Sequence, residues 1–184
     1  MKLEMKNPVQ KTVFVGVLAA VLAVLSQISV PMPSGVPVTL QTFAVALCGC
    51  VLGPAMGTAA VGVYLTLGAV GVPVLAGFGG GFGSFLGVTG GFLWGFLPMA
   101  LLCGLGSRAG NKAVIILLGM AGLLACHLCG VVQFALVMSV SFPQAFFTVS
   151  LPYLIKDVVS VVLAYFAAMA VIASLKKAGL GGAA

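Results

Sequence analysis

The chain has 184 residues, of which 62% are hydrophobic and 5% charged, and its formal net charge is +6. Soluble globular domains have about a quarter of their residues charged, so this composition excludes that class and predicts an integral membrane protein in contact with lipid. The apolar runs are continuous rather than alternating, which disfavours a membrane β-barrel. The basic residues stand near the chain ends and in one intermediate stretch, so the positive charge does not indicate nucleic-acid binding.

The apolar runs predict helices separated by glycine- and proline-rich breaks. One membrane-spanning helix needs about 20 apolar residues, so the length allows roughly six spans and no soluble domain. We therefore expect one membrane domain over residues 1–184. The expected helices cover residues 12–29, 39–52, 54–70, 84–105, 112–138 and 150–175. The second and third are short for a span, which a tilted helix or a loop would compensate.

The positions of the basic residues predict the orientation in the membrane. Positive residues stay on the cytoplasmic side, and the three basic groups can all do so only if even numbers of spans separate them. We expect an all-α, six-helix protein of the cell membrane with both termini in the cytoplasm. The basic groups are Lys2, Lys6 and Lys11, then Arg108 and Lys112, then Lys176 and Lys177.

Asp157 is the only acidic residue after Glu4, and Lys156 precedes it. Each such charge at the middle of a membrane helix costs roughly 2.5–3.5 kcal/mol, so we interpret the two residues as part of a polar ligand cavity. Helix neighbours point about 100° apart, so an ion pair between them is not the expected reason for their presence. The competing interpretation is structural, with Lys156 at the outer interface and Asp157 bonded to a neighbouring helix.

Two irregular segments are expected to enclose this cavity. Residues 71–83 are rich in glycine, and non-helical backbone at membrane depth is tolerated only where it is buried or lines a cavity. Residues 30–37 contain three prolines, which exclude a helix interior and predict an outer loop. After the first segment, Gly87, Gly91 and Gly95 would let a helix or a ligand approach closely. A phosphate-binding loop is absent from the sequence, so the chain alone has no means of using ATP.

Aromatic and amide side chains near these segments are weaker candidates for ligand contacts. Amides and the single histidine, His127, are expected to bridge helices more often than to bind a ligand. The further ligand-contact candidates are Gln41, Phe78, Phe85, Thr89, Trp94 and Gln133. One Asp, one Glu near the chain terminus and one His cannot build a paired-carboxylate site or a catalytic triad, so we expect no enzyme activity. The C-x-x-C at residues 126–129 has no second such motif to complete the four ligands of a zinc site, so we expect no metal.

Short motifs spread over nearly the whole chain are specific only when taken together. They are PVTLQTF at 37–43, LGP at 52–54, YLTLGAVGVPV at 64–74, GGG at 79–81, TGGFLWGF at 89–96 and LPYLIKD at 151–157. Together they resemble the BioY family, the biotin-binding S components of energy-coupling factor (ECF) transporters. The resemblance implies a small membrane subunit that captures biotin from outside without a cofactor. It also implies three partners, namely a membrane coupling subunit and two ATP-binding subunits.

The resemblance also implies roles for individual residues. Asp157 would accept hydrogen bonds from the ureido N–H groups of biotin, and Ala19 and Ala23 would dock the coupling subunit. The lysine of the family motif is replaced by Ser160, one helical turn from Lys156, so we expect Lys156 to meet the biotin carboxylate instead. The alternative function is a stand-alone secondary transporter that uses Asp157 to carry a proton or cation.

Overall fold

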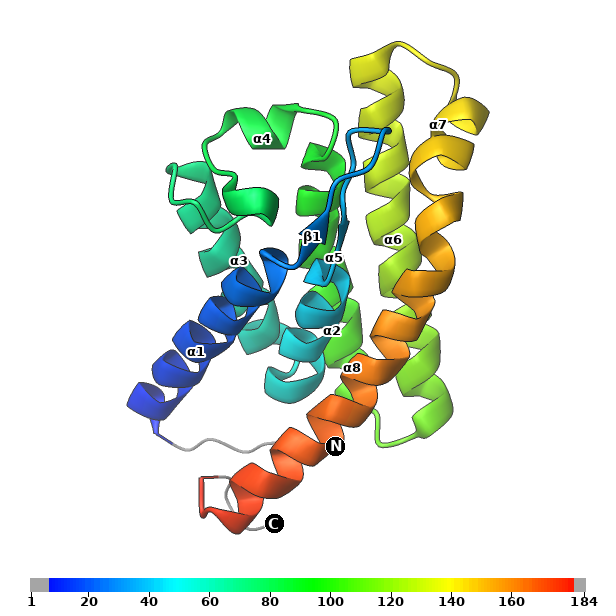
Figure 1. Cartoon of the computed structure of the whole chain (residues 1–184). Helices are drawn as coiled ribbons and strands as arrows, with labels where there is room; N and C mark the ends of the chain where they lie inside the picture. The colour runs from blue at the N-terminus through cyan, green and yellow to red at the C-terminus, as the bar shows by residue number, and fades with distance from the viewer. Residues whose placement is uncertain (1–6, 181–184) are drawn as a thin grey trace.

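The computed structural model describes residues 7–180, so Lys2 and Lys6 of the first basic group lie outside it. Long helices dominate the fold (Figure 1). The long helices are α1 (Pro8–Ser26), α2 (Gln41–Leu52), α3 (Pro54–Ala69), α5 (Gly90–Arg108), α6 (Lys112–Met138) and α8 (Leu151–Lys177). The short elements are β1 (Ser29–Val30), β2 (Val38–Thr39), the 3-10 turn η1 (Ala76–Phe78), α4 (Gly83–Leu86) and α7 (Phe142–Val149).

Four of the described helices, α1, α5, α6 and α8, are long and apolar enough to cross a membrane, whereas α2 and α3 are apolar but shorter. The helix expected over 84–105 is divided in the structure. Helix α4 ends at Leu86, the backbone at Gly87 is extended, and α5 begins only at Gly90. Helix α7 was not expected from the sequence, although proline is tolerated in the first turn of a helix.

With the exception of Lys156, the basic residues of the described chain gather at one end of the molecule. Figure 1 shows the start of α1, the connection between α5 and α6 and the end of α8 at the bottom of the view. The Gln10 side-chain amide donates a hydrogen bond to the Leu180 carbonyl at 2.7 Å, which ties the first helix to the end of the last. The residues at this end are Lys11, Arg108, Lys112, Lys176 and Lys177.

The opposite end carries the irregular segments and the short helices α4 and α7 (Figure 1). Strands β1 and β2 pair in antiparallel fashion, with Ser29 opposite Thr39 and Val30 opposite Val38. The proline-rich residues 31–37 form the tip of this hairpin. Proline cannot donate a ladder hydrogen bond, which explains why the strands are short.

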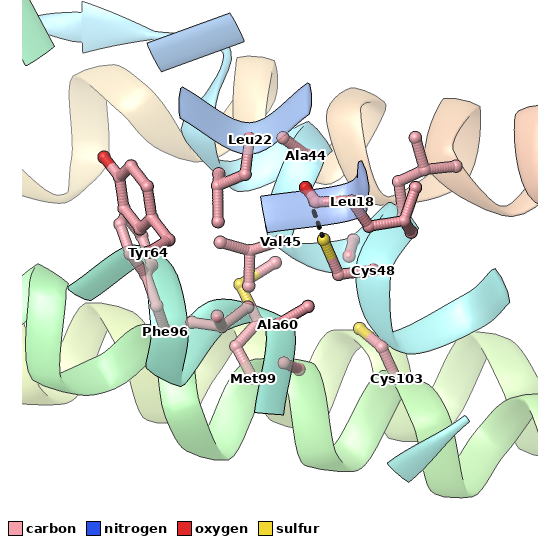
Figure 2. Packing of buried hydrophobic residues seen from close by; sticks show 14 of the residues in the cluster. Leu18, Leu22, Ala44, Val45, Cys48, Ala60, Tyr64, Phe96, Met99 and Cys103 are labelled. Carbon is pink, nitrogen blue, oxygen red and sulfur yellow. Dashed lines mark hydrogen bonds between the residues drawn. The ribbon is translucent and has the colours of Figure 1, made fainter. Parts of the chain in front are cut away.

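Helix α2 lies at the centre of the helix packing, and every residue in it except Phe43 is buried. Figure 2 shows its neighbours: side chains of α1, α3 and α5 converge on Val45 and Cys48. The Cys48 thiol donates to the Leu18 carbonyl at 3.7 Å. At Gly49 an added Cβ would collide with the Ala100 carbonyl oxygen. Small residues therefore let backbones approach closely, as in other membrane helix bundles.

Helices α5 and α6 make a second close contact through the glycines that the sequence singled out. A Cβ at Gly91 would collide with the Cys129 carbonyl oxygen, and one at Gly95 would lie 2.7 Å from the Cys126 Cα. Gly87 lies before α5 and takes no part in this contact. The close packing of α6 on α5 brings His127 toward the helix ends that surround the cavity described next.

Candidate functional site

A cavity of about 290 Å³ lies between the start of α2, the start of α5, the start of α8 and the two irregular segments. This volume is near the lower limit for small-molecule sites. One part of its wall is apolar and includes Leu75, Phe92, Leu93 and Phe96. The polar side chains in its wall are Thr39, Gln41, Thr42, Ser84, Thr89, Tyr153, Lys156 and Asp157.

The hairpin is held over the cavity by the first turns of α8. The Tyr153 hydroxyl donates to the Val36 carbonyl at 2.5 Å and lies 2.9 Å from the Ser34 hydroxyl. The Lys156 ammonium donates to the Thr39 carbonyl at 2.9 Å. These contacts position the proline-rich tip as one wall of the cavity.

The glycine-rich segment is held by the end of α1. The Ser26 hydroxyl and the Gln27 side-chain amide both donate to the Val74 carbonyl, at 2.5 and 3.0 Å. The Phe78 backbone N–H donates to the Gln27 side-chain oxygen at 2.8 Å. Within this turn Gly77 has φ 64°, a conformation that favours glycine. The segment is therefore an ordered, cavity-lining loop tied to α1.

Asp157 is 5% exposed, and each of its carboxylate oxygens lies beside a basic side chain. Its Oδ1 forms an ion pair with the Lys156 ammonium, and its Oδ2 lies 3.2 Å from His127 Nε2. The expectation that adjacent helix residues would not pair is wrong here, because the flexible lysine stem lets the ammonium fold back. The Lys156 side chain is 29% exposed and lines the cavity, so it does not simply extend to the outer interface.

Half of the predicted ligand-contact residues border the cavity, and these are Gln41, Thr89, Lys156 and Asp157. The Gln41 amide has partners at both atoms. Its nitrogen donates to the Tyr64 hydroxyl at 2.7 Å, and its oxygen accepts from the Thr39 hydroxyl at 3.0 Å. Gln41 therefore also fixes the start of α2 against α3.

The other predicted contacts lie outside the lining, at Phe78, Phe85, Trp94 and Gln133. The Gln133 side-chain nitrogen donates to the Phe85 and Gly87 carbonyls at 2.8 and 2.9 Å, which holds the break between α4 and α5. Phe85 is 2% exposed and packs edge-on against Trp94, while Phe78 is 71% exposed. In this arrangement these four residues shape the segments around the cavity.

Two neighbours of the site, Tyr153 and His127, were missing from the predicted contacts. Tyr153 precedes Asp157 by one helical turn, so the i, i+4 spacing could have revealed it. His127 lies on another helix, and its hydrogen bonds connect α6 to Ser150 and Asp157, in line with the expected bridging role. No spacing rule links it to Asp157, because the packing of α6 against α8 creates the contact.

The predicted docking residues of α1 are partly covered by the chain itself. Ala19 is 4% exposed and belongs to the core, and Ala23 is half-buried. The exposed face of α1 carries another pair of small residues four apart, Gly16 and Ala20. A Cβ added to Gly16 would meet no atom within 4 Å. The exposed small residues of α1 are therefore Gly16 and Ala20, and not the predicted pair Ala19 and Ala23.

Comparisons with known proteins agree with this architecture. The BioY family model matches residues 1–177. A probable biotin transporter BioY of Pyrococcus horikoshii is 40% identical over 145 residues, covering 79% of this chain and 85% of the relative. The biotin transporter BioY of Thermotoga maritima is 42% identical over 117 residues, covering 63% and 69%.

The fold is also similar to a solved structure. It matches the crystal structure of the S-component for biotin from an ECF-type ABC transporter with a TM-score of 0.80, at 24% identity and over 95% of both chains. This similarity establishes the fold, and the family match over nearly the whole sequence establishes the relationship. The chain belongs to the BioY family.

Proposed function

We propose that this chain is the high-affinity biotin-binding membrane subunit, or S component, of an ECF-type vitamin uptake transporter. The observation that carries the proposal is the cavity, where Asp157 and Lys156 stand beside an apolar wall. Biotin offers a matching set of groups, namely an apolar ring and chain, a ureido group and a carboxylate. Membership of a family with relatives named as biotin transporters supports this ligand.

Asp157 would recognise the ureido end of biotin. Its Oδ2 is engaged by His127, so Oδ1, which is buried beside the Lys156 ammonium, would accept from the ureido N–H groups once that ammonium moves away. A hydrogen bond to a charged group contributes about 1.5–3 kcal/mol. The apolar wall at Phe92 and Phe96 would cover the ring system.

Lys156 would recognise the carboxylate of biotin. Among the described residues that line the cavity it is the one cation. Its ammonium now contacts Asp157 and the Thr39 carbonyl. The ureido group and the carboxylate lie at opposite ends of biotin, so Lys156 would turn away from Asp157 as the ligand enters. The long lysine stem permits this movement.

The subunit would work with three partners in the cell membrane. Helices α1, α2, α3, α5, α6 and α8 would cross the bilayer, with the basic end and both termini on the cytoplasmic side. The chain would need no cofactor, because two ATP-binding subunits would supply the energy through a membrane coupling subunit. We expect the coupling subunit to dock on the exposed face of α1 at Gly16 and Ala20, since the core covers Ala19.

Identification of the small molecule that co-purifies with the chain tests this proposal without assuming the ligand. The chain is expressed in cells supplied with a mixture of vitamins, purified in detergent and extracted for mass spectrometry. We expect biotin in roughly stoichiometric amount and its loss from the variant Asp157→Asn. Enrichment of a different vitamin, or of none, would contradict the assignment of biotin.

A further inference from the structure

His127 is a buried titratable side chain that contacts the proposed ligand-binding carboxylate from behind. It is 4% exposed and lies outside the cavity lining. Its Nε2 lies 3.2 Å from Asp157 Oδ2, and its Nδ1 lies 2.8 Å from the Ser150 hydroxyl. Its ring packs edge-on against Phe92, which belongs to the cavity wall. The contacts with Asp157 and Phe92 therefore connect His127 to the cavity.

The two hydrogen bonds select one tautomer of the imidazole ring. An ionised Asp157 can only accept, so His127 Nε2 carries the hydrogen. In a neutral ring Nδ1 then has a lone pair, and the Ser150 hydroxyl donates to it. In that form, hydrogen-bond donation runs from Ser150 to His127 and on to Asp157.

We propose that His127 is a positioning residue for biotin recognition. It fixes Asp157 through Oδ2 and thereby keeps Oδ1 beside Lys156 in the wall of the cavity. This inference rests on the proposed role of Asp157 in binding biotin. A free aspartate can rotate about its side-chain bonds, whereas one held by a buried partner has lost that freedom before the ligand arrives. Preorganisation of this kind raises affinity because less ordering remains to be done on binding.

The variants His127→Phe and His127→Gln distinguish the loss of the hydrogen bond to Asp157 from a change in side-chain packing. Phenylalanine keeps a planar ring but removes both nitrogens, while glutamine retains an N–H donor for Asp157. Partners that orient a binding group typically change affinity by about 10–100-fold at metal sites. For biotin binding to the full-length chain we expect about a tenfold loss in His127→Phe and recovery of most of it in His127→Gln.

Leu128→Phe serves as the control for a bulky ring on the same turn of α6. Leu128 is 47% exposed and does not line the cavity, so this variant should bind biotin like the wild type. Equal affinity of the wild type and His127→Phe would overturn the proposal. Failure of His127→Gln to recover any affinity lost in His127→Phe would also overturn it.

A double-mutant cycle tests whether His127 acts through Asp157. In the Asp157→Asn background, with biotin titrated to high concentration, His127→Phe should cause little further loss, because the carboxylate that it positions is already gone. The loss caused by His127→Phe should therefore be clearly smaller in that background than in the wild type. A loss of the same size in both backgrounds would show independent action and overturn the proposal.

Infrared difference spectra give a readout that does not depend on biotin. The carboxylate band of Asp157 is identified as the band lost in Asp157→Asn. It should shift in His127→Phe and return in His127→Gln. An unshifted band in His127→Phe would overturn the role of His127, whereas a wild-type chain that fails to bind biotin would overturn only the proposed function.

Discussion

The carboxylate of Asp157 illustrates how a buried charge is accommodated in an apolar chain. One of its oxygens contacts an ammonium and the other an imidazole, and 5% of the residue remains exposed. Removing one partner of a buried ion pair leaves the other charge uncompensated. The stability lost in this way is larger than the net stabilisation that the intact pair provides. The effect of a substitution in this cluster is therefore measured best as the difference between its effects on the affinities of two ligands that differ by one functional group.

Lys156→Ala should weaken biotin binding by about 2 kcal/mol or more, since truncating one partner of a buried charge pair typically costs about 2–5 kcal/mol. If Lys156 meets the biotin carboxylate, the loss should be much smaller for the neutral amide of biotin. Titration of both ligands into both proteins measures the difference. An equal loss for the two ligands would remove the proposed contact between Lys156 and the carboxylate.

The sequence located part of this cluster and left part of it hidden. Lys156 and Asp157 stood out because charged residues are rare in this chain, and both line the cavity. The ion pair between them was not foreseen, because helix geometry describes Cβ directions and not the reach of a long stem. The contact of His127 with Asp157 depends on which faces of α6 and α8 meet, which an almost uniformly apolar sequence does not specify.

At the scale of elements, glycines determine how closely the helices approach. Between α5 and α6, Gly91 and Gly95 bring the backbones together, and α6 in turn carries His127. Helix boundaries were predictable where glycine or proline marks them, as at Pro54. They were less predictable between 84 and 90, where the Gln133 amide and extended backbone at Gly87 interrupt an apolar run. These determinants are tertiary contacts, so local sequence could not reveal them.

Gly91→Leu should destabilise the protein, because its side chain would collide with the Cys129 carbonyl. Overpacking of this kind costs about 1–3 kcal/mol or more. Thermal unfolding in detergent, followed by loss of the monomeric peak in size-exclusion chromatography, measures the effect. Gly16→Leu is the matched control on an open helix face and should unfold like the wild type. A wild-type transition in Gly91→Leu would contradict the packing described for α5 and α6.

The exposed face of α1 is the surface on which we expect the membrane coupling subunit to dock. Gly16→Leu and Ala20→Leu should reduce co-purification with the membrane coupling subunit while leaving biotin binding unchanged. Ala19→Leu should instead lower stability, because Ala19 lies in the core at 4% exposure. Co-expression of each variant with the coupling subunit, followed by affinity purification, distinguishes these results. Normal assembly of both exposed-face variants would contradict docking at this surface.

At the scale of the whole molecule, two ends of different character face away from each other (Figure 1). One end carries the described basic residues other than Lys156, and the other end carries the cavity, which Lys156 lines, with its hairpin and glycine-rich loop. The charge pattern of the sequence predicted that the basic groups share an end. The shorter lengths of α2 and α3 were also expected. Helix α2 is buried in the centre of the molecule, whereas α3 keeps Val63 and Leu67 exposed on its outer face.

Thiol labelling tests the proposed orientation in the membrane. Single cysteines at exposed positions replace Lys177, at the basic end, and Gln144, at the cavity end, in a background without the native Cys129. In intact cells a membrane-impermeant maleimide should label Gln144→Cys and spare Lys177→Cys until the cells are opened. Labelling of Lys177→Cys in intact cells would contradict a cytoplasmic C-terminus.

Calorimetric titration measures whether the cavity binds biotin through Asp157. In Asp157→Asn the amide oxygen would accept from His127, which turns an N–H donor toward Lys156 and toward the ureido N–H groups of the ligand. We predict saturable one-site binding of biotin to the purified wild-type chain and a loss of about 1.5–3 kcal/mol or more in Asp157→Asn, which remains folded. Unchanged affinity in a folded Asp157→Asn protein, or no binding to the wild type, would contradict the account.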